Sequence, residues 1–273
     1  MMIMAQDFGS VADIAVYYEI TVFLIFNYIL YLQYKYKKIK PTPLKNISFR
    51  IFIGYSVAIF FSAISKFLNA RYGGVPETLY DSPYLGLVGR LHGARFSFIG
   101  VVIGTIYSYE LYLRIFKKEI PKNKRNIVIL IGLGICIFLG TVYSFNLEEE
   151  RANQVFEIIS FSLLLGFAMV VYIPFTVQAF KLAKRLKDVE GEENYRKGIL
   201  SLGGASLSFI CIFICLVLDR FMLIVFNIAY SAFYFMAWIF AIIAIWLVYA
   251  GFIKPAKLSQ PKYKTKEKEE RQK

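Results

Sequence analysis

The chain has 273 residues, of which 58% are hydrophobic and 18% aromatic, and its mean hydropathy is +0.54. Its apolar runs of about twenty residues are longer than a buried core helix needs and match a hydrocarbon layer of roughly 30 Å crossed by a helix. This composition excludes a soluble globular protein, and the lack of alternation between polar and apolar residues argues against barrel strands.

We expect seven membrane-spanning helices, one for each apolar run. They lie near residues 14 to 34, 48 to 68, 86 to 113, 127 to 145, 154 to 180, 199 to 218 and 224 to 253. No Lys or Arg precedes the first run, so we expect no cleaved signal peptide. The sequence therefore predicts an all-α fold, a polytopic membrane protein whose seven-transmembrane-helix bundle occupies residues 1 to 254.

The basic residues predict the orientation of these helices. Of the 32 Lys and Arg, 26 follow the first, third, fifth and seventh spans, whereas the other loops are richer in Asp and Glu. Because positive loops stay on the cytoplasmic side, the N-terminus is expected outside and the C-terminus inside, in a multi-pass plasma-membrane protein. Contact with the anionic inner face of the lipid bilayer accounts for the net charge of +13, so no nucleic-acid partner is expected. Residues 255 to 273 are expected to form a basic, disordered cytoplasmic tail.

Small residues recur along the third span at steps of three or four. They are Gly86, Gly89, Gly93, Ser97, Gly100, Gly104 and Ser108. Stripes of this kind let helix backbones approach each other closely in lipid. We therefore expect the third helix to lie at the centre of the bundle.

Six ionisable side chains share one level near the outer ends of the expected spans. They are Glu19, Lys66, Arg90, His92, Arg95 and Glu157. Charges that face lipid cost about 2.5 to 3.5 kcal/mol each, so we expect them to turn inward and form a vestibule. The surplus of cations suits a small anionic or carboxylate-bearing ligand that enters from outside, because an arginine fork grips a carboxylate at two points. A ring of interfacial anchors and structural salt bridges explains the same pattern, and the sequence leaves both interpretations open.

Five further positions carry structural expectations. Asp219 and Arg220 are expected to cap the hairpin between the last two helices, because they separate two apolar runs. Glu110 and Arg114 are four residues apart and can form an ion pair on one helix face. Asn27 can bridge two helices with a hydrogen bond.

The residue inventory argues against an enzyme or a metalloprotein. Cys136, Cys211 and Cys215 all lie in apolar runs, where free cysteine behaves as a small hydrophobic residue. The single histidine cannot form a multi-histidine metal site, and the HExxH and GxSxG motifs are missing from the sequence. We expect no catalytic residue, no cofactor and no metal.

The segment WLVYAGFIKPAKL, Trp246 to Leu258, closes the last expected span. It resembles the end of the last helix in prokaryotic seven-helix sensory modules, which often precede histidine kinases or other signalling domains. A retinal-binding rhodopsin is not expected, because the last span has no lysine before Lys254. The resemblance implies a prokaryotic, receptor-like protein that signals through a separate cytoplasmic partner. A small-solute transporter, or a structural membrane protein without a ligand, is the alternative.

Overall fold

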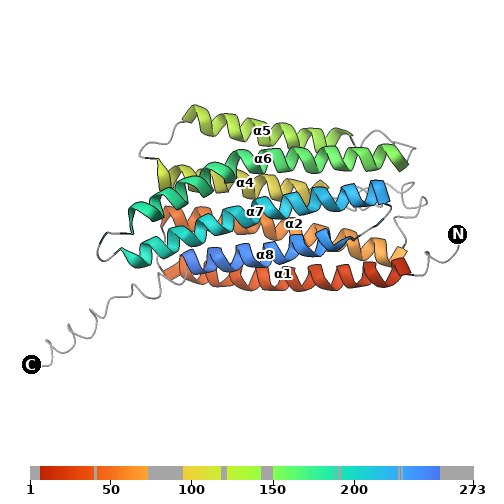
Figure 1. The fold of residues 1–273 in the computed structure, drawn as a ribbon, viewed down its shortest axis with the longest axis horizontal. Coiled ribbons are helices and arrows are strands. Elements are labelled where there is room, and N and C mark those ends of the chain that lie inside the picture. Colours follow the sequence, from red (N-terminus) through yellow and green to blue (C-terminus); the bar gives the residue numbers. More distant parts are fainter. Residues whose placement is uncertain are drawn as a thin grey trace, which may run out of the picture.

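A computed structural model of the chain describes residues 7–39, 42–72, 95–117, 122–142, 150–187, 189, 192–226, 228 and 230–252. Within these residues the chain forms seven helices, shown in Figure 1: α1 (Asp7–Ile39), α2 (Pro43–Tyr72), α4 (Arg95–Phe116), α5 (Lys122–Val142), α6 (Glu150–Arg185), α7 (Glu193–Phe226) and α8 (Ala232–Phe252). Each of the seven expected spans overlaps one of these helices, in chain order. α1 begins at the end of the bundle opposite to that at which α8 ends.

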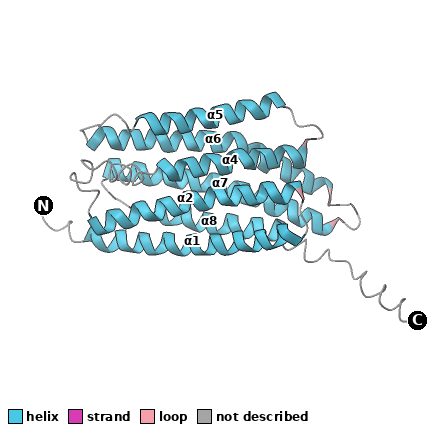
Figure 2. Cartoon of the chain, turned by 180° about the vertical axis from the view of Figure 1, so that it is seen from behind, coloured by secondary structure: helices cyan, strands magenta, loops and turns pink. Residues whose placement is uncertain are grey.

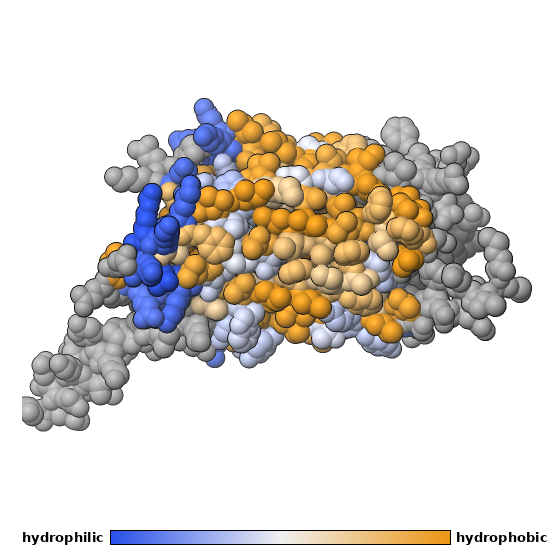
Figure 3. Space-filling model, in the orientation of Figure 1, coloured by the Kyte–Doolittle hydropathy of each residue, from blue (hydrophilic) through white to orange (hydrophobic). Residues whose placement is uncertain are grey.

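The helices have the length and composition of membrane spans. Six helices in the described part of the chain contain a stretch long and apolar enough to cross a membrane: α1, α2, α4, α6, α7 and α8. The expected span 127 to 145 overlaps α5, which is not one of these six helices. On the face that Figure 3 shows, the middle of the bundle is apolar, and strongly hydrophilic residues lie at the end where α8 ends. The chain is a helical, multi-pass membrane protein.

The six apolar helices form a closed ring. Each of α1, α2, α4, α6, α7 and α8 contacts the next in this order, and α8 contacts α1 again. α5 packs on α4 and α6 from outside the ring, at one edge of the bundle in both views (Figures 1 and 2). The expectation of a central third helix is therefore wrong, because α4 is one member of the ring and the ring encloses the centre.

The small residues of α4 are used in a contact with one neighbour, α2. A Cβ atom added to Gly100 would lie 2.7 Å from the backbone nitrogen of Ala58 and 2.7 Å from the carbonyl oxygen of Gly54. A Cβ atom added to Gly54 would lie 2.7 Å from the nitrogen of Gly104. The two backbones thus touch, which is the contact that a small-residue stripe predicts. The remaining glycines of the stripe, Gly86, Gly89 and Gly93, lie outside the described residues.

The turn between α7 and α8 lies later in the chain than expected. α7 continues to Phe226, about two turns past the expected end, because the apolar segment FMLIVF follows Arg220 directly. The expected position of Asp219 and Arg220 in the turn is therefore wrong, because both lie inside α7. Asp219 is 3% exposed, and its Oδ1 accepts hydrogen bonds from the backbone N–H and the hydroxyl of Ser231, both at 2.8 Å. It fixes the start of α8 from a position inside α7.

Two smaller expectations are confirmed. Arg114 forms an ion pair with Glu110 at 3.0 Å on the surface of α4. Asn27 of α1 accepts a hydrogen bond of 2.9 Å from the hydroxyl of Ser56 of α2. Both contacts lie where the sequence spacing and residue type place them.

Gly100→Ala should lower the free energy of unfolding by about 1 to 3 kcal/mol, because the added methyl group has to push two backbones apart. The control is Gly134→Ala, where an added Cβ atom meets nothing within 4 Å, and it should stay within about 0.5 kcal/mol of the parent protein. Unfolding in detergent micelles, followed by circular dichroism, measures both. Equal stability of the two variants would contradict the tight contact between α2 and α4.

Candidate functional site

The ring encloses a cavity of about 110 Å³ in the half of the bundle nearer to the start of α1. All six helices of the ring contribute to its lining. About 10 to 15 Å³ is enough for one water molecule, so this cavity has room for several waters or for a small organic molecule. We call it the chamber.

The chamber holds a carboxylate at membrane depth. Glu19 of α1 is completely buried, and its Oε1 accepts hydrogen bonds from the hydroxyl of Ser62 of α2, at 3.1 Å, and from the hydroxyl of Tyr234 of α8. A carboxyl group is costly to bury unless other groups hydrogen-bond to it. Neighbouring helices on both sides supply those donors, so the ring itself holds Glu19 against the chamber.

The chamber also holds a cation that the sequence predicts at the hairpin between the last two helices. Arg220 lines the chamber from α7, and its guanidinium carbon lies 5.4 Å from the centre of the Phe161 ring of α6. Such a cation-π contact favours a charged group in apolar surroundings. The apolar run after Arg220 is the signal that would have placed this residue inside a helix.

An indole group adds a hydrogen-bond donor to the same wall. Trp238 of α8 lines the chamber, and its Nε1–H is buried and meets no acceptor in hydrogen-bond geometry among the described residues. Tryptophan N–H groups usually find an acceptor when they are buried. This donor lies in the chamber wall close to the hydroxyl of Tyr234, on the same helix.

Of the six residues of the expected vestibule, Glu19 has a described side chain. Lys66, Arg95 and Glu157 belong to α2, α4 and α6, but their side chains lie outside the described part of the structure, and Arg90 and His92 lie outside it altogether. Lys66 follows the chamber residue Ser62 by four positions, and Glu157 precedes Phe161 by four. Residues four apart share a helix face, so these positions lie about one turn from the chamber. The vestibule remains a prediction for these five residues.

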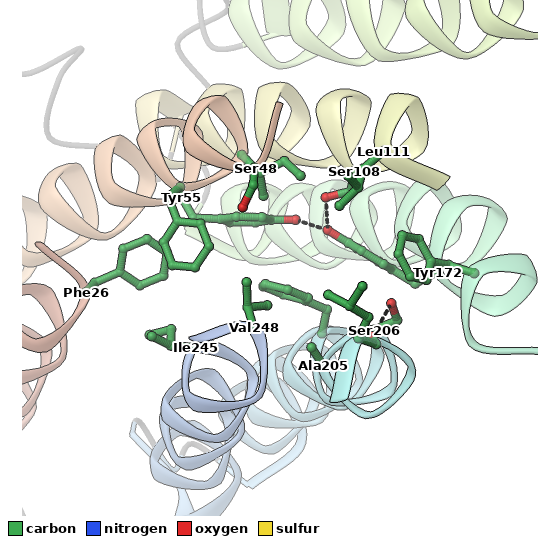
Figure 4. A pocket seen from close by; sticks show the side chains of 15 residues that line it. Phe26, Ser48, Tyr55, Ser108, Leu111, Tyr172, Ala205, Ser206, Ile245 and Val248 are labelled. Atoms are coloured by element: carbon green, nitrogen blue, oxygen red, sulfur yellow. Dashed lines mark hydrogen bonds between the residues drawn. The ribbon is translucent and has the colours of Figure 1, made fainter. Parts of the chain in front are cut away.

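A layer of three aromatic rings closes the chamber on the side away from the start of α1. The ring of Phe209 of α7 stacks on Tyr55 of α2 and on Tyr172 of α6, with centroid distances of 4.8 Å and 5.1 Å. The two tyrosine hydroxyls bond to each other, as Figure 4 shows, and Tyr172 donates to the hydroxyl of Ser108 at 2.9 Å. The hydroxyl of Tyr55 also lies 3.2 Å from that of Thr105. We call Tyr55, Tyr172 and Phe209 the tyrosine layer.

A much smaller cavity of about 30 Å³ lies on the other side of the tyrosine layer. Its polar lining includes the hydroxyls of Ser48, Ser108 and Ser206. In Figure 4, Ser48 and Ser108 lie in the upper part of the view and Ser206 lies in the lower part. Tyr55 and Phe209 of this layer, together with Phe26 of α1, line both cavities. The layer is thus the partition between a chamber that can take a ligand and a space for one or two waters.

Comparisons with protein-family models, with curated proteins and with solved structures find no match for this chain.

Tyr55→Phe and Tyr172→Phe keep both rings but remove the linked hydroxyls. Each should lower the free energy of unfolding by about 1 to 2 kcal/mol. Because they remove the same hydrogen bond, the double variant should lose at least about 0.5 kcal/mol less than the sum of the single losses. Ser208→Ala is the control, since that hydroxyl bonds to the carbonyl of Gly204 in its own helix. Strict additivity of the two tyrosine substitutions would contradict the bond between them.

Proposed function

We propose that this chain is a receptor-like sensory protein of a prokaryotic plasma membrane, with seven spans and the N-terminus outside. A small, carboxylate-bearing ligand enters the chamber from outside, and the response passes to a separate cytoplasmic partner.

The observation that carries this proposal is the presence of Glu19 and Arg220 in one buried chamber. Ionisable groups at membrane depth are costly, and by default they mark a functional site. A concave, mostly apolar pocket with a few convergent polar groups is the usual form of a small-molecule site. The hydrophilic end of the bundle lies opposite the chamber half, and the positive-inside rule assigns that end to the cytoplasm (Figure 3).

The tyrosine layer gives ligand binding a route to the cytoplasmic half. Tyr55 faces the chamber and also bonds to Tyr172, so a ligand that moves its ring changes the contact between α2 and α6. Pro174 follows Tyr172 by two residues, and a proline removes one hydrogen bond of its helix. A ligand that fits one arrangement of this layer better than another shifts the population between the two.

A transporter is the second candidate function. The observation in its favour is that the two cavities share Tyr55 and Phe209, so movement of these rings would join the cavities. The receptor is preferred because the smaller cavity has space for waters alone, whereas a carrier has to offer its substrate a second exit.

The orientation and the opening of the chamber can be tested by thiol labelling. With Cys136, Cys211 and Cys215 replaced by alanine, Ser97→Cys at the chamber wall should react with a charged, membrane-impermeant methanethiosulfonate added to intact cells. Ser208→Cys, which lines neither cavity, should not react. A cysteine placed at Gln272 should react after the cells are permeabilised but not before. Labelling at position 272 in intact cells would reverse the orientation and remove the proposed ligand entry.

Binding and transport can be separated with the purified protein. We expect saturable binding of at least one of radiolabelled acetate, L-lactate and L-alanine to the protein in nanodiscs. Sealed proteoliposomes with the same protein should show no time-dependent accumulation of the bound compound beyond that of empty liposomes. Accumulation that saturates with concentration would identify a transporter and contradict the receptor.

A further inference from the structure

We propose that the ligand of the chamber is a small zwitterion with an apolar side chain, of the α-amino acid class. The proposal rests on the proposed function, because it names the ligand of the same chamber. Its amino group would meet Glu19, and its carboxylate would meet Arg220.

Charge balance favours a zwitterion over a simple anion. Among the described residues that line the chamber, the charged side chains are one carboxylate and one guanidinium. A ligand that carries one charge of each sign can contact both groups and adds no net charge to the chamber. A monoanion would add a net charge to a site of low dielectric constant, where unpaired charge is costly.

The two charges belong to different walls of the ring. Hydrogen bonds from α2 and α8 hold the carboxylate of Glu19, which comes from α1 between them. Arg220 lies over the Phe161 ring of α6, and α6 is three steps from α1 in either direction around the ring. The buried Nε1–H of Trp238 offers a further donor to a carboxylate. An α-amino acid carries its amine and its carboxylate on one carbon atom, so a single small molecule offers a donor for Glu19 and an acceptor for Arg220 and Trp238.

The rest of the lining selects an apolar side chain. Phe98 and Phe161 meet edge to face with their ring centres 4.8 Å apart, and Phe213 and Leu216 continue this apolar wall. The volume of about 110 Å³ limits the ligand to a few carbon atoms beyond the two charged groups. Apart from a few hydroxyl groups and the two charged groups, the lining is apolar, which favours a short apolar side chain over a long or charged one.

The test measures the affinity of the full-length protein in nanodiscs by isothermal titration calorimetry. The probes are glycine, L-alanine, L-valine, L-leucine and L-phenylalanine. The amino acid that binds most tightly is then compared with two analogues, one without the amino group and one without the carboxylate. For L-valine these are 3-methylbutanoate and isobutylamine. We expect the amino acid to bind at least tenfold more tightly than either analogue, and this comparison needs no variant.

Substitutions then assign each charge to its partner. Glu19→Gln should weaken amino-acid binding at least tenfold but change binding of the analogue without an amino group less than threefold. Arg220→Gln should also weaken amino-acid binding at least tenfold, but it should change binding of the analogue without a carboxylate less than threefold. Glu110→Gln, in the surface pair on α4, is the matched control and should change neither. Retained binding of the unaffected analogue shows that a variant is folded.

The outcomes distinguish this proposal from the function on which it rests. If the analogue without an amino group binds the parent protein as tightly as the amino acid, the zwitterion is overturned and a carboxylate receptor stands. If none of the five amino acids binds while the cysteine at position 97 is still labelled from outside, the ligand class is wrong but the open chamber stands. If that cysteine is not labelled either, both proposals fall.

Discussion

The close contact between α2 and α4 is the constraint on which the interior of this bundle depends. A side chain at Gly104 would collide with the ring of Tyr55, since a Cβ atom there would lie 2.8 Å from it. Because Gly104 has none, the Tyr55 ring can lie flat against α4 and extend its hydroxyl to Tyr172 of α6, the next helix of the ring. A phenol in the membrane interior needs a hydrogen-bond partner, and Tyr172, Thr105 and Ser108 form that network. The glycines therefore produce both the helix contact and the partition between the two cavities.

Polar pairs between α1 and α2 set the height of Glu19 in the membrane. The residue numbers rise along α1 while they fall along α2, as antiparallel helices require, in the pairs Glu19–Ser62, Asn27–Ser56 and Gln33–Ser48. Hydrogen bonds of this kind contribute only about 0.6 kcal/mol on average in membrane helices, so their sum adds little stability. A shift of α1 along α2 would leave several buried polar groups without partners at once. The pairs thus act mainly on register, and the register places the carboxylate at the chamber.

The sequence predicts the helices and a close backbone contact at the small residues of α4, but it does not predict the ring of six helices or the chamber. Span positions and the small stripe at Gly100 and Gly104 are local, periodic signals, so they can be read without a structure. The tyrosine layer joins residues 117 positions apart in the chain, and no period in the sequence marks such a pair. The sequence predicts Arg220 at a turn because it stands beside Asp219 between two apolar runs. Two polar residues inside a buried helix produce the same pattern. Span length alone predicts the level of Glu19 along its helix, but its partners Ser62 and Tyr234 belong to helix neighbours that only the fold defines.

The position of Tyr55 would couple a ligand in the chamber to the packing of the helices beneath it. Its ring lines the chamber and the smaller cavity, stacks on Phe209 and bonds to Tyr172, so it cannot move without breaking contacts to three other helices. Packed interiors with such shared contacts have a few discrete arrangements rather than a continuum. A ligand that touches Tyr55 therefore acts on the packing of α2 against α6 and α7 as a unit. The same sharing limits what the site can bind, because a ligand large enough to displace the ring would also remove the floor of the chamber.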